Sequence, residues 1–132
     1  MDTIKVLLVD DEVQFLVTLN KRLTKRGFDV RQAHSGEEAL GVLAEYDADV
    51  IILDVKMPGM DGISALNKIK TQWPLKEVIM LTGHASVEVA IRGMELGAFD
   101  YLMKPVDFEE FLYKIEDAVK RKRLQEEKMN SL

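Results

Sequence analysis

The 132-residue sequence contains no cysteine and only two histidines. Without cysteine the chain can form neither a disulfide framework nor a thiolate metal site, and two histidines provide little for a zinc site. Any bound metal would therefore have oxygen ligands. The sequence also lacks an apolar run near the roughly 20 residues of a membrane-spanning helix, and its N-terminus lacks the pattern of a signal peptide. These absences predict a cytoplasmic protein without a membrane partner.

Basic residues are fewer than acidic ones, 18 against 23, so the formal net charge is -5. This balance argues against direct nucleic-acid binding by the domain, although residues 120–123, "KRKR", form a local basic cluster. Apolar residues make up 47% of the sequence, which is ordinary for a folded protein. The length suits one hydrophobic core. We assign residues 1–123 to a single domain and residues 124–132 to a charged tail that extends the last helix.

Short apolar runs alternate with longer segments of helical period along the chain, which predicts a parallel sheet covered by helices. The expected strands are residues 4–9, 28–33, 50–53, 78–81 and 100–103. The expected helices are residues 13–25, 36–45, 62–72, 87–96, and 108–123 or beyond. Residues suited to cap these helices are Ser35, Asp61 and Asp107 at their starts, and Gly27 and Gly97 just past their ends.

The composition of the strands predicts their order in the sheet. Strands covered on both faces read as unbroken apolar runs, as the first, third and fourth do. The second strand alternates and the fifth is short and contains Asp100, so we place these two at the edges. Right-handed crossovers then give the order 2-1-3-4-5, a doubly wound, flavodoxin-like (βα)5 sandwich of the α/β class. Ligands of such sheets bind where the order reverses, beyond the carboxyl ends of strands 1 and 3.

Three carboxylates are expected at that crevice. Asp10 and Asp11 follow the first strand, and Asp54 follows the apolar run of the third. Two such charges about 4 Å apart repel by roughly 4 kcal/mol at an effective dielectric constant near 20. A hard divalent cation would offset this repulsion; Mg²⁺ fits best because it commonly binds carboxylates beside phosphate, and Mn²⁺ is another candidate. The alternative interpretation is that Asp10 and Asp11 are plain helix-start residues.

Two further polar residues end strands at the same edge of the sheet. Lys104 in "MKP" follows the fifth strand, and Thr82 in "LTG" follows the fourth. A cation, an ammonium group and a hydroxyl that converge on a carboxylate could hold a tetrahedral anion, as phosphoryl transfer requires. Packing of a β-branched residue at a strand end is the alternative explanation for Thr82.

Four motifs make the sequence similar to a known family. They are "VDDE" at residues 9–12, "LDVKMPGMDG" at 53–62, "LTGHAS" at 81–86 and "GAFDYLMKP" at 97–105. With these motifs the chain resembles the receiver domains of two-component response regulators over about residues 4–120. The last two motifs look most like those of receivers attached to transcriptional activators.

The resemblance implies that Asp54 is the phosphoacceptor, which takes a phosphoryl group from a sensor histidine kinase or a histidine phosphotransfer protein. Asp11 and Asp54 would ligate Mg²⁺ directly, together with the backbone carbonyl of Lys56. Asp10 would act mostly through bound water, and Lys104 would pair with a phosphoryl oxygen. The domain would phosphorylate and dephosphorylate itself without turning over an external substrate.

The resemblance also implies a switch. Thr82 would donate its hydroxyl to a phosphoryl oxygen, and Tyr101 would turn inward behind it. This movement would change the surface of the fourth helix, fifth strand and fifth helix, where a downstream output protein or domain, or a second copy of the chain, would bind. Gly93 weakens the fourth helix by roughly 1 kcal/mol relative to alanine, which suits a moving part. A cis peptide bond is expected before Pro105.

Two other functions share parts of this pattern. An aspartate-nucleophile phosphohydrolase also uses acids, Mg²⁺, threonine and lysine, but it usually carries a second acid two residues after the nucleophile, where this sequence has Lys56. A flavodoxin-like electron carrier shares the sheet order, but the acids after the first strand would repel a flavin phosphate. The receiver interpretation itself leaves three cases open: a stand-alone regulator, a phosphotransfer shuttle, and a part of a longer regulator.

Overall fold

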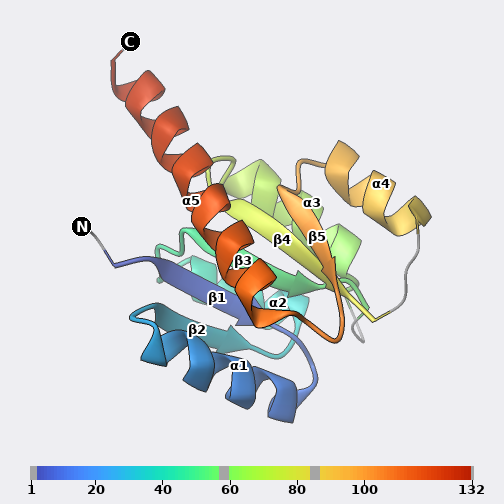
Figure 1. Cartoon of the computed structure of the whole chain (residues 1–132). Coiled ribbons are helices and arrows are strands. Elements are labelled where there is room, and N and C mark those ends of the chain that lie inside the picture. Colours follow the sequence, from blue (N-terminus) through green and yellow to red (C-terminus); the bar gives the residue numbers. More distant parts are fainter. Residues whose placement is uncertain (1–2, 57–59, 84–86, 132) are drawn as a thin grey trace.

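The computed structural model describes residues 3–56, 60–83 and 87–131. Within these residues a five-stranded parallel sheet lies between two layers of helices (Figure 1). The strands are β1 (Lys5–Val9), β2 (Asp29–Ala33), β3 (Val50–Asp54), β4 (Glu77–Thr82) and β5 (Asp100–Met103). The helices are α1 (Val13–Lys25), α2 (Gly36–Leu43), α3 (Gly62–Gln72), α4 (Val87–Glu95) and α5 (Phe108–Asn130). The strand order is β2-β1-β3-β4-β5, which confirms the predicted doubly wound fold.

The predicted elements differ from the structure at their ends. β3 runs one residue further than predicted, to Asp54, and β4 begins one residue earlier and ends one residue later, at Glu77 and Thr82. The two strands continue because they pair with each other. Asp54 lies opposite Leu81, and the amide of Val55 donates to the carbonyl of Leu81 at 3.0 Å. Asp54 is therefore held in the backbone ladder of the sheet.

α2 ends at Leu43, two residues before its predicted end at residue 45. The chain turns there so that Tyr46 enters the core, where it is 5% exposed. Its hydroxyl donates to the carbonyl of Asp29 at 3.0 Å. The amide of Tyr46 donates to the carbonyl of Val42 at 2.8 Å, which closes the last turn. A buried ring thus shortens a helix that the sequence pattern would have continued.

Alternate side chains of the central strands face opposite helix layers. In β1, Val6 and Leu8 pack in the core beneath α1 and α5, whereas Leu7 and Val9 pack in the core beneath α2 and α3. Phe111 of α5 is fully buried, and burial of a side chain of this size stabilises the fold by roughly 1.5 to 3 kcal/mol. Both faces of the sheet are covered, as the unbroken apolar runs predict.

The helix caps follow the sequence prediction. Ser35, Asp61 and Asp107 precede α2, α3 and α5, and each side chain accepts a backbone N–H from the first turn of its helix. Gly27 and Gly97 have φ angles of +90° and +101°. This left-handed region is open to glycine without steric cost, so both residues end helices as expected.

Two glycines allow helices to pack closely on the sheet, one of them beside the expected site. A Cβ atom at Gly62 would lie 2.3 Å from the Cα of Val55 and 2.6 Å from the carbonyl oxygen of Asp54. α3 therefore begins directly against the backbone that carries Asp54. A Cβ atom at Gly93 would lie 2.2 Å from the side chain of Met80. Gly93 thus lets α4 sit on β4, which is a packing role that the sequence analysis did not find.

The basic cluster at residues 120–123 lies on α5, and two of its members are used within the fold. Arg121 donates to both carboxylate oxygens of Glu77, which is 1% exposed. Lys122 donates to Asp49 and Glu126, each at 3.1 Å. The pairs with Glu77 and Asp49 hold α5 against the starts of β4 and β3, whereas Glu126 lies on α5 itself. Among the described residues, no helix combines the length and the apolar composition needed to cross a membrane.

Replacing Gly62 by alanine should destabilise the fold, because the new methyl group would press on backbone atoms of β3. Overpacking of this kind costs about 1 to 3 kcal/mol. Gly41 is the matched control: it lies exposed in α2 with nothing within 4 Å of an added Cβ, so Gly41→Ala should stabilise by about 0.5 to 1 kcal/mol. Urea unfolding gives both free energies. A Gly62→Ala variant as stable as wild type would contradict the close contact.

Candidate functional site

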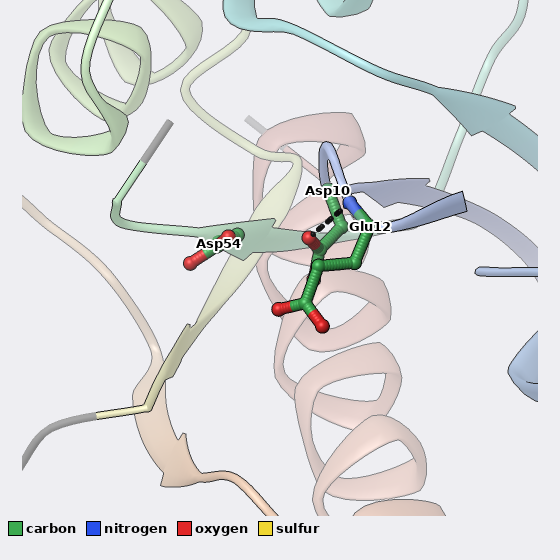
Figure 2. Close-up of side chains that lie close together, drawn as sticks. All are labelled: Asp10, Glu12 and Asp54. Carbon is green, nitrogen blue, oxygen red and sulfur yellow. Dashed lines mark hydrogen bonds between the residues drawn. The ribbon is translucent and has the colours of Figure 1, made fainter. Parts of the chain in front are cut away.

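Asp10 and Asp54 meet at the edge of the sheet where the strands end. Asp10 directly follows β1 and Asp54 ends β3, and Val9 lies opposite Leu53 in the ladder between them. Because the strands are parallel neighbours, the two carboxylates leave the sheet at the same edge. Both residues are buried, Asp10 being 1% exposed and Asp54 4%. Figure 2 shows them from neighbouring strands together with Glu12, which follows Asp10 in the chain.

Backbone amides hold the two aspartates in place. Oδ1 of Asp10 accepts from the amide of Glu12 at 2.9 Å, the bond drawn in Figure 2. Oδ1 of Asp54 accepts from the amide of Lys56 at 3.1 Å. In each case the acceptor bonds the backbone two residues further on, a turn that Asp favours. Each carboxylate therefore keeps one oxygen fixed by the backbone, while Oδ2 faces the crevice.

Lys104 supplies the positive charge of the site. Its Nζ lies 2.7 Å from Oδ2 of Asp10, 2.8 Å from Oε1 of Glu12 and 3.9 Å from Oδ2 of Asp54. The first two distances are hydrogen bonds and the third is not. The peptide bond between Lys104 and Pro105 is cis, as the resemblance implies. One ammonium group thus faces three carboxylates and bonds to two of them.

Burial and neighbouring charges change the protonation of the site. Burial raises the pKa of Asp54 to about 6, and the charge of Asp10 adds to the rise, although the amide of Lys56 and the ammonium of Lys104 oppose it. Burial alone would lower the pKa of Lys104, but its hydrogen bonds to Asp10 and Glu12 raise it above the ordinary value. The lysine therefore stays charged, and the site is still short of positive charge.

The carboxylates could hold a metal ion. One oxygen from each of Asp10, Glu12 and Asp54 lies within 4.8 Å of the others. Carboxylate oxygens are the ligands that hard divalent cations prefer. The single ammonium of Lys104 does not neutralise three acids, so a cation would relieve the remaining repulsion. The residues present fit a hard divalent cation such as Mg²⁺.

The structure brings together three of the predicted residues, Asp10, Asp54 and Lys104. It adds Glu12, to which the sequence analysis gave no role. Asp11, in contrast, is exposed and does not belong to the acidic cluster of the described residues. The signal for Glu12 was present as the last letter of "VDDE". Glu12 is the N-cap residue of α1, and its carboxylate reaches Lys104.

Thr82 ends β4 beside this cluster. Its carbonyl accepts from the amide of Lys104 at 2.8 Å, so the backbones of the two residues are joined. The residue is half-buried and lines a groove between the ends of β3 and β4, the start of α3 and the helix α4. This groove, of roughly 400 Å³, is lined by Val55, Lys56, Asp61, Ile63, Ser64, Thr82 and Val89.

Tyr101 lies on β5 and is 42% exposed. It lines a second groove, of roughly 480 Å³, together with Ala90, Ile91, Met94 and Glu95 of α4. The tyrosine is therefore on the α4 side of the sheet edge in this structure. Residues 57–59 and 84–86, with His84 among them, complete two of the four motifs and lie outside the described residues.

Comparisons with known proteins identify relatives of the whole domain. Residues 6–116 match the response regulator receiver domain family. The chain is 38% identical over 118 residues to the transcriptional regulatory protein ZraR of Escherichia coli K12, which covers 89% of this chain and 27% of that protein. It is 35% identical over 124 residues to the DNA-binding transcriptional regulator NtrC of Klebsiella pneumoniae, which covers 94% of this chain and 26% of that protein. The chain thus spans about a quarter of these relatives.

Solved structures show the same fold. The crystal structure of a response regulator receiver domain protein from Clostridium thermocellum superposes with a TM-score of 0.88 at 39% sequence identity, covering 92% of this chain and 98% of that one. The family match, the alignments with these relatives and the superposition each extend over most of the chain. The chain therefore belongs to the response regulator receiver domains, the receiving modules of two-component signal transduction.

Proposed function

We propose that Asp54 is the phosphoacceptor of this receiver domain and that its donor is a phosphohistidine on a sensor histidine kinase or a histidine phosphotransfer protein. The observation that carries the proposal is a buried carboxylate at the end of β3, 3.9 Å from the ammonium of Lys104. A pKa of about 6 leaves this carboxylate largely ionised at neutral pH. It is also more basic than an ordinary carboxylate, which favours attack on phosphorus.

A divalent cation completes the proposed site. Asp10, Asp11 and Asp54, with the backbone carbonyl of Lys56, would hold Mg²⁺, or Mn²⁺ in its place. Asp11 is exposed at the rim of the crevice, so its side chain is accessible to a cation there. When bound, the cation would neutralise charge on the phosphoryl oxygens and on the carboxylates around them.

The transfer itself needs only a nucleophile and groups that stabilise charge. A carboxylate oxygen of Asp54 would attack phosphorus with its electron pair. The bond from phosphorus to the donor imidazole would break, leaving its electron pair on the imidazole nitrogen. Lys104 would pair with one phosphoryl oxygen, and the hydroxyl of Thr82 would donate to another. Hydrolysis of the acyl phosphate would restore Asp54, so the domain would not turn over an external substrate.

We expect the modification to be read at the surface formed by α4, β5 and α5. Thr82 shares its groove with Val89 of α4, so movement of the threonine would reach that helix. Tyr101 would then turn inward from its exposed position. Exposed apolar residues of this surface include Ile91, Met94, Tyr101, Met103 and Tyr113. A downstream output protein or domain, or a second copy of the chain on phosphorylation, would bind there.

The output itself is proposed to lie outside this domain. ZraR and NtrC carry names that refer to transcription, and they are about four times as long as the matched region. In this chain Arg121 and Lys122 of the basic cluster are engaged in ion pairs, which supports a domain that does not bind nucleic acid itself. We further propose that the domain works in the cytoplasm.

Acetyl phosphate with Mg²⁺ should label the wild-type domain once, at Asp54. Intact-mass spectrometry should show the mass of one added phosphoryl group, and Asp54→Asn should abolish it because the amide is not a nucleophile. Asp61→Asn is the matched control, since Asp61 is an exposed helix cap and asparagine caps equally well. Labelling that persists in Asp54→Asn would refute the proposed acceptor. Sustained release of phosphate from small esters would instead favour a phosphohydrolase.

Titration with Mg²⁺ should shift the amide NMR signals of residues 10, 11 and 54. Asp10→Asn should weaken the affinity for Mg²⁺ by about tenfold or more, because it removes a negative charge from the buried cluster. The Asp61→Asn variant should bind Mg²⁺ like wild type. Signals that stay unchanged at millimolar Mg²⁺ would exclude a metal site at this crevice.

Ionised Asp54 should oppose folding at neutral pH when no metal is present. Its pKa rises from an ordinary 3.8 to about 6 on folding, so the folded state binds the proton more tightly and stability falls as the pH rises from about 4 through 6. The free energy of unfolding of Asp54→Asn should therefore exceed that of wild type by about 1 to 3 kcal/mol near neutral pH. Near pH ~4 the two free energies should differ little. Urea unfolding at both pH values, with Asp61→Asn as control, measures the gap. A stability difference between the two proteins that does not change with pH would contradict the claim that ionised Asp54 opposes folding.

A further inference from the structure

Lys104 is held on the side of the crevice that faces α1. Its Nζ donates to Oδ2 of Asp10 at 2.7 Å and to Oε1 of Glu12 at 2.8 Å. The ring centroid of Phe15 lies 4.4 Å from the same nitrogen, so the aromatic face also attracts the ammonium. Asp54 is 3.9 Å away, beyond hydrogen-bond distance. Asp10 directly after β1, with Glu12 and Phe15 at the start of α1, thus competes with the proposed phosphoacceptor for one lysine.

We propose that Glu12 is a positioning residue that competes with the phosphoryl group for Lys104 and so lowers the affinity of the site for that group. This inference rests on the proposed phosphoacceptor role of Asp54. An ammonium group has three N–H donors, and in the unmodified domain two of those on Lys104 point to Asp10 and Glu12. A phosphoryl group on Asp54 would meet an ammonium whose charge is already shared with these two carboxylates, so its pairing with Lys104 competes with theirs.

Glu12 is the contact that can be released. The side chain of Asp10 is 1% exposed, so loss of its partner would leave a buried charge uncompensated. The side chain of Glu12 is 63% exposed, and water can take the place of the lysine. Among the described residues, Lys104 is also the ion-pair partner of Glu12, and Glu12 makes no capping hydrogen bond to α1. Its side chain is therefore available for holding Lys104.

The charge of Glu12 could also act alone, by repelling any anion at Asp54. Shortening the side chain separates the two explanations. Glu12→Asp keeps the charge but withdraws the carboxylate by one methylene, so it releases Lys104 without neutralising the site. Aspartate is a favoured N-cap residue, so the variant keeps a good start for α1.

The experiment measures the dissociation constant of beryllofluoride, a mimic of the acyl phosphate, in saturating Mg²⁺ by NMR of the amide of Asp54. Glu12→Asp should bind the probe about two- to fivefold more tightly than wild type, the range expected for loss of an exposed ion pair. The NMR signal of the Lys104 ammonium should shift in the same variant before the probe is added. Glu109→Asp is the matched control, because Glu109 is an exposed acid that pairs with Arg26, and its affinity should equal that of wild type.

A double-mutant comparison adds a readout that a purely structural role would not change. In a Lys104→Gln background, Glu12→Asp should have no effect on the affinity, because the competing contact no longer exists. An affinity equal to wild type in Glu12→Asp, or the same gain with Lys104 absent, would overturn the role of Glu12. Failure of the wild-type domain to bind the probe at Asp54 would instead overturn the proposed function.

Discussion

The carboxylates of Asp10, Glu12 and Asp54 stand close together around the single ammonium group of Lys104. At an effective dielectric constant near 20, each pair of negative charges at about 4 Å opposes folding by roughly 4 kcal/mol. The lysine offsets part of this repulsion. Burial raises the pKa of Asp54 to about 6, and the charge of Asp10 adds to that rise. The site therefore attracts positive charge, which the proposed transfer of an anionic phosphoryl group would need.

The fold makes this crowding possible because the rest of the domain is strongly stabilised. β1, β3 and β4 are buried on both faces, so their ends cannot move apart without exposing two cores. Opposite charges are paired at the other end of the sheet, where Glu77 meets Arg121 and Asp49 meets Lys122. Charge is thus balanced at one edge and left unbalanced at the edge that carries the site. The edge with paired charges therefore stabilises the domain, and the edge with unpaired charge carries the candidate site.

Much of this arrangement follows from the sequence, for a physical reason. A strand buried on both faces must be apolar throughout, so the strand order could be predicted from composition. The carboxyl ends of parallel strands share one edge of the sheet, so Asp10, Asp54 and Lys104 could be placed together. Side-chain direction in a loop follows no such periodicity, which is why Glu12 was missed and Asp11 was expected in the cluster. The same holds for Lys122: in sequence it belongs to a solvated charge run, but in the fold it is buried and pairs with Asp49, a half-buried acid 73 positions away.

The contact between Gly62 and the backbone of Val55 leaves no space for even a methyl group. α3 and the end of β3 therefore form one rigid unit, and Asp54 belongs to it. If Asp54 is the acceptor, as proposed, it could not adapt its position to different donors. The donor protein would then have to align the incoming phosphorus, and differences between donors would be accommodated by the exposed side chains of α1.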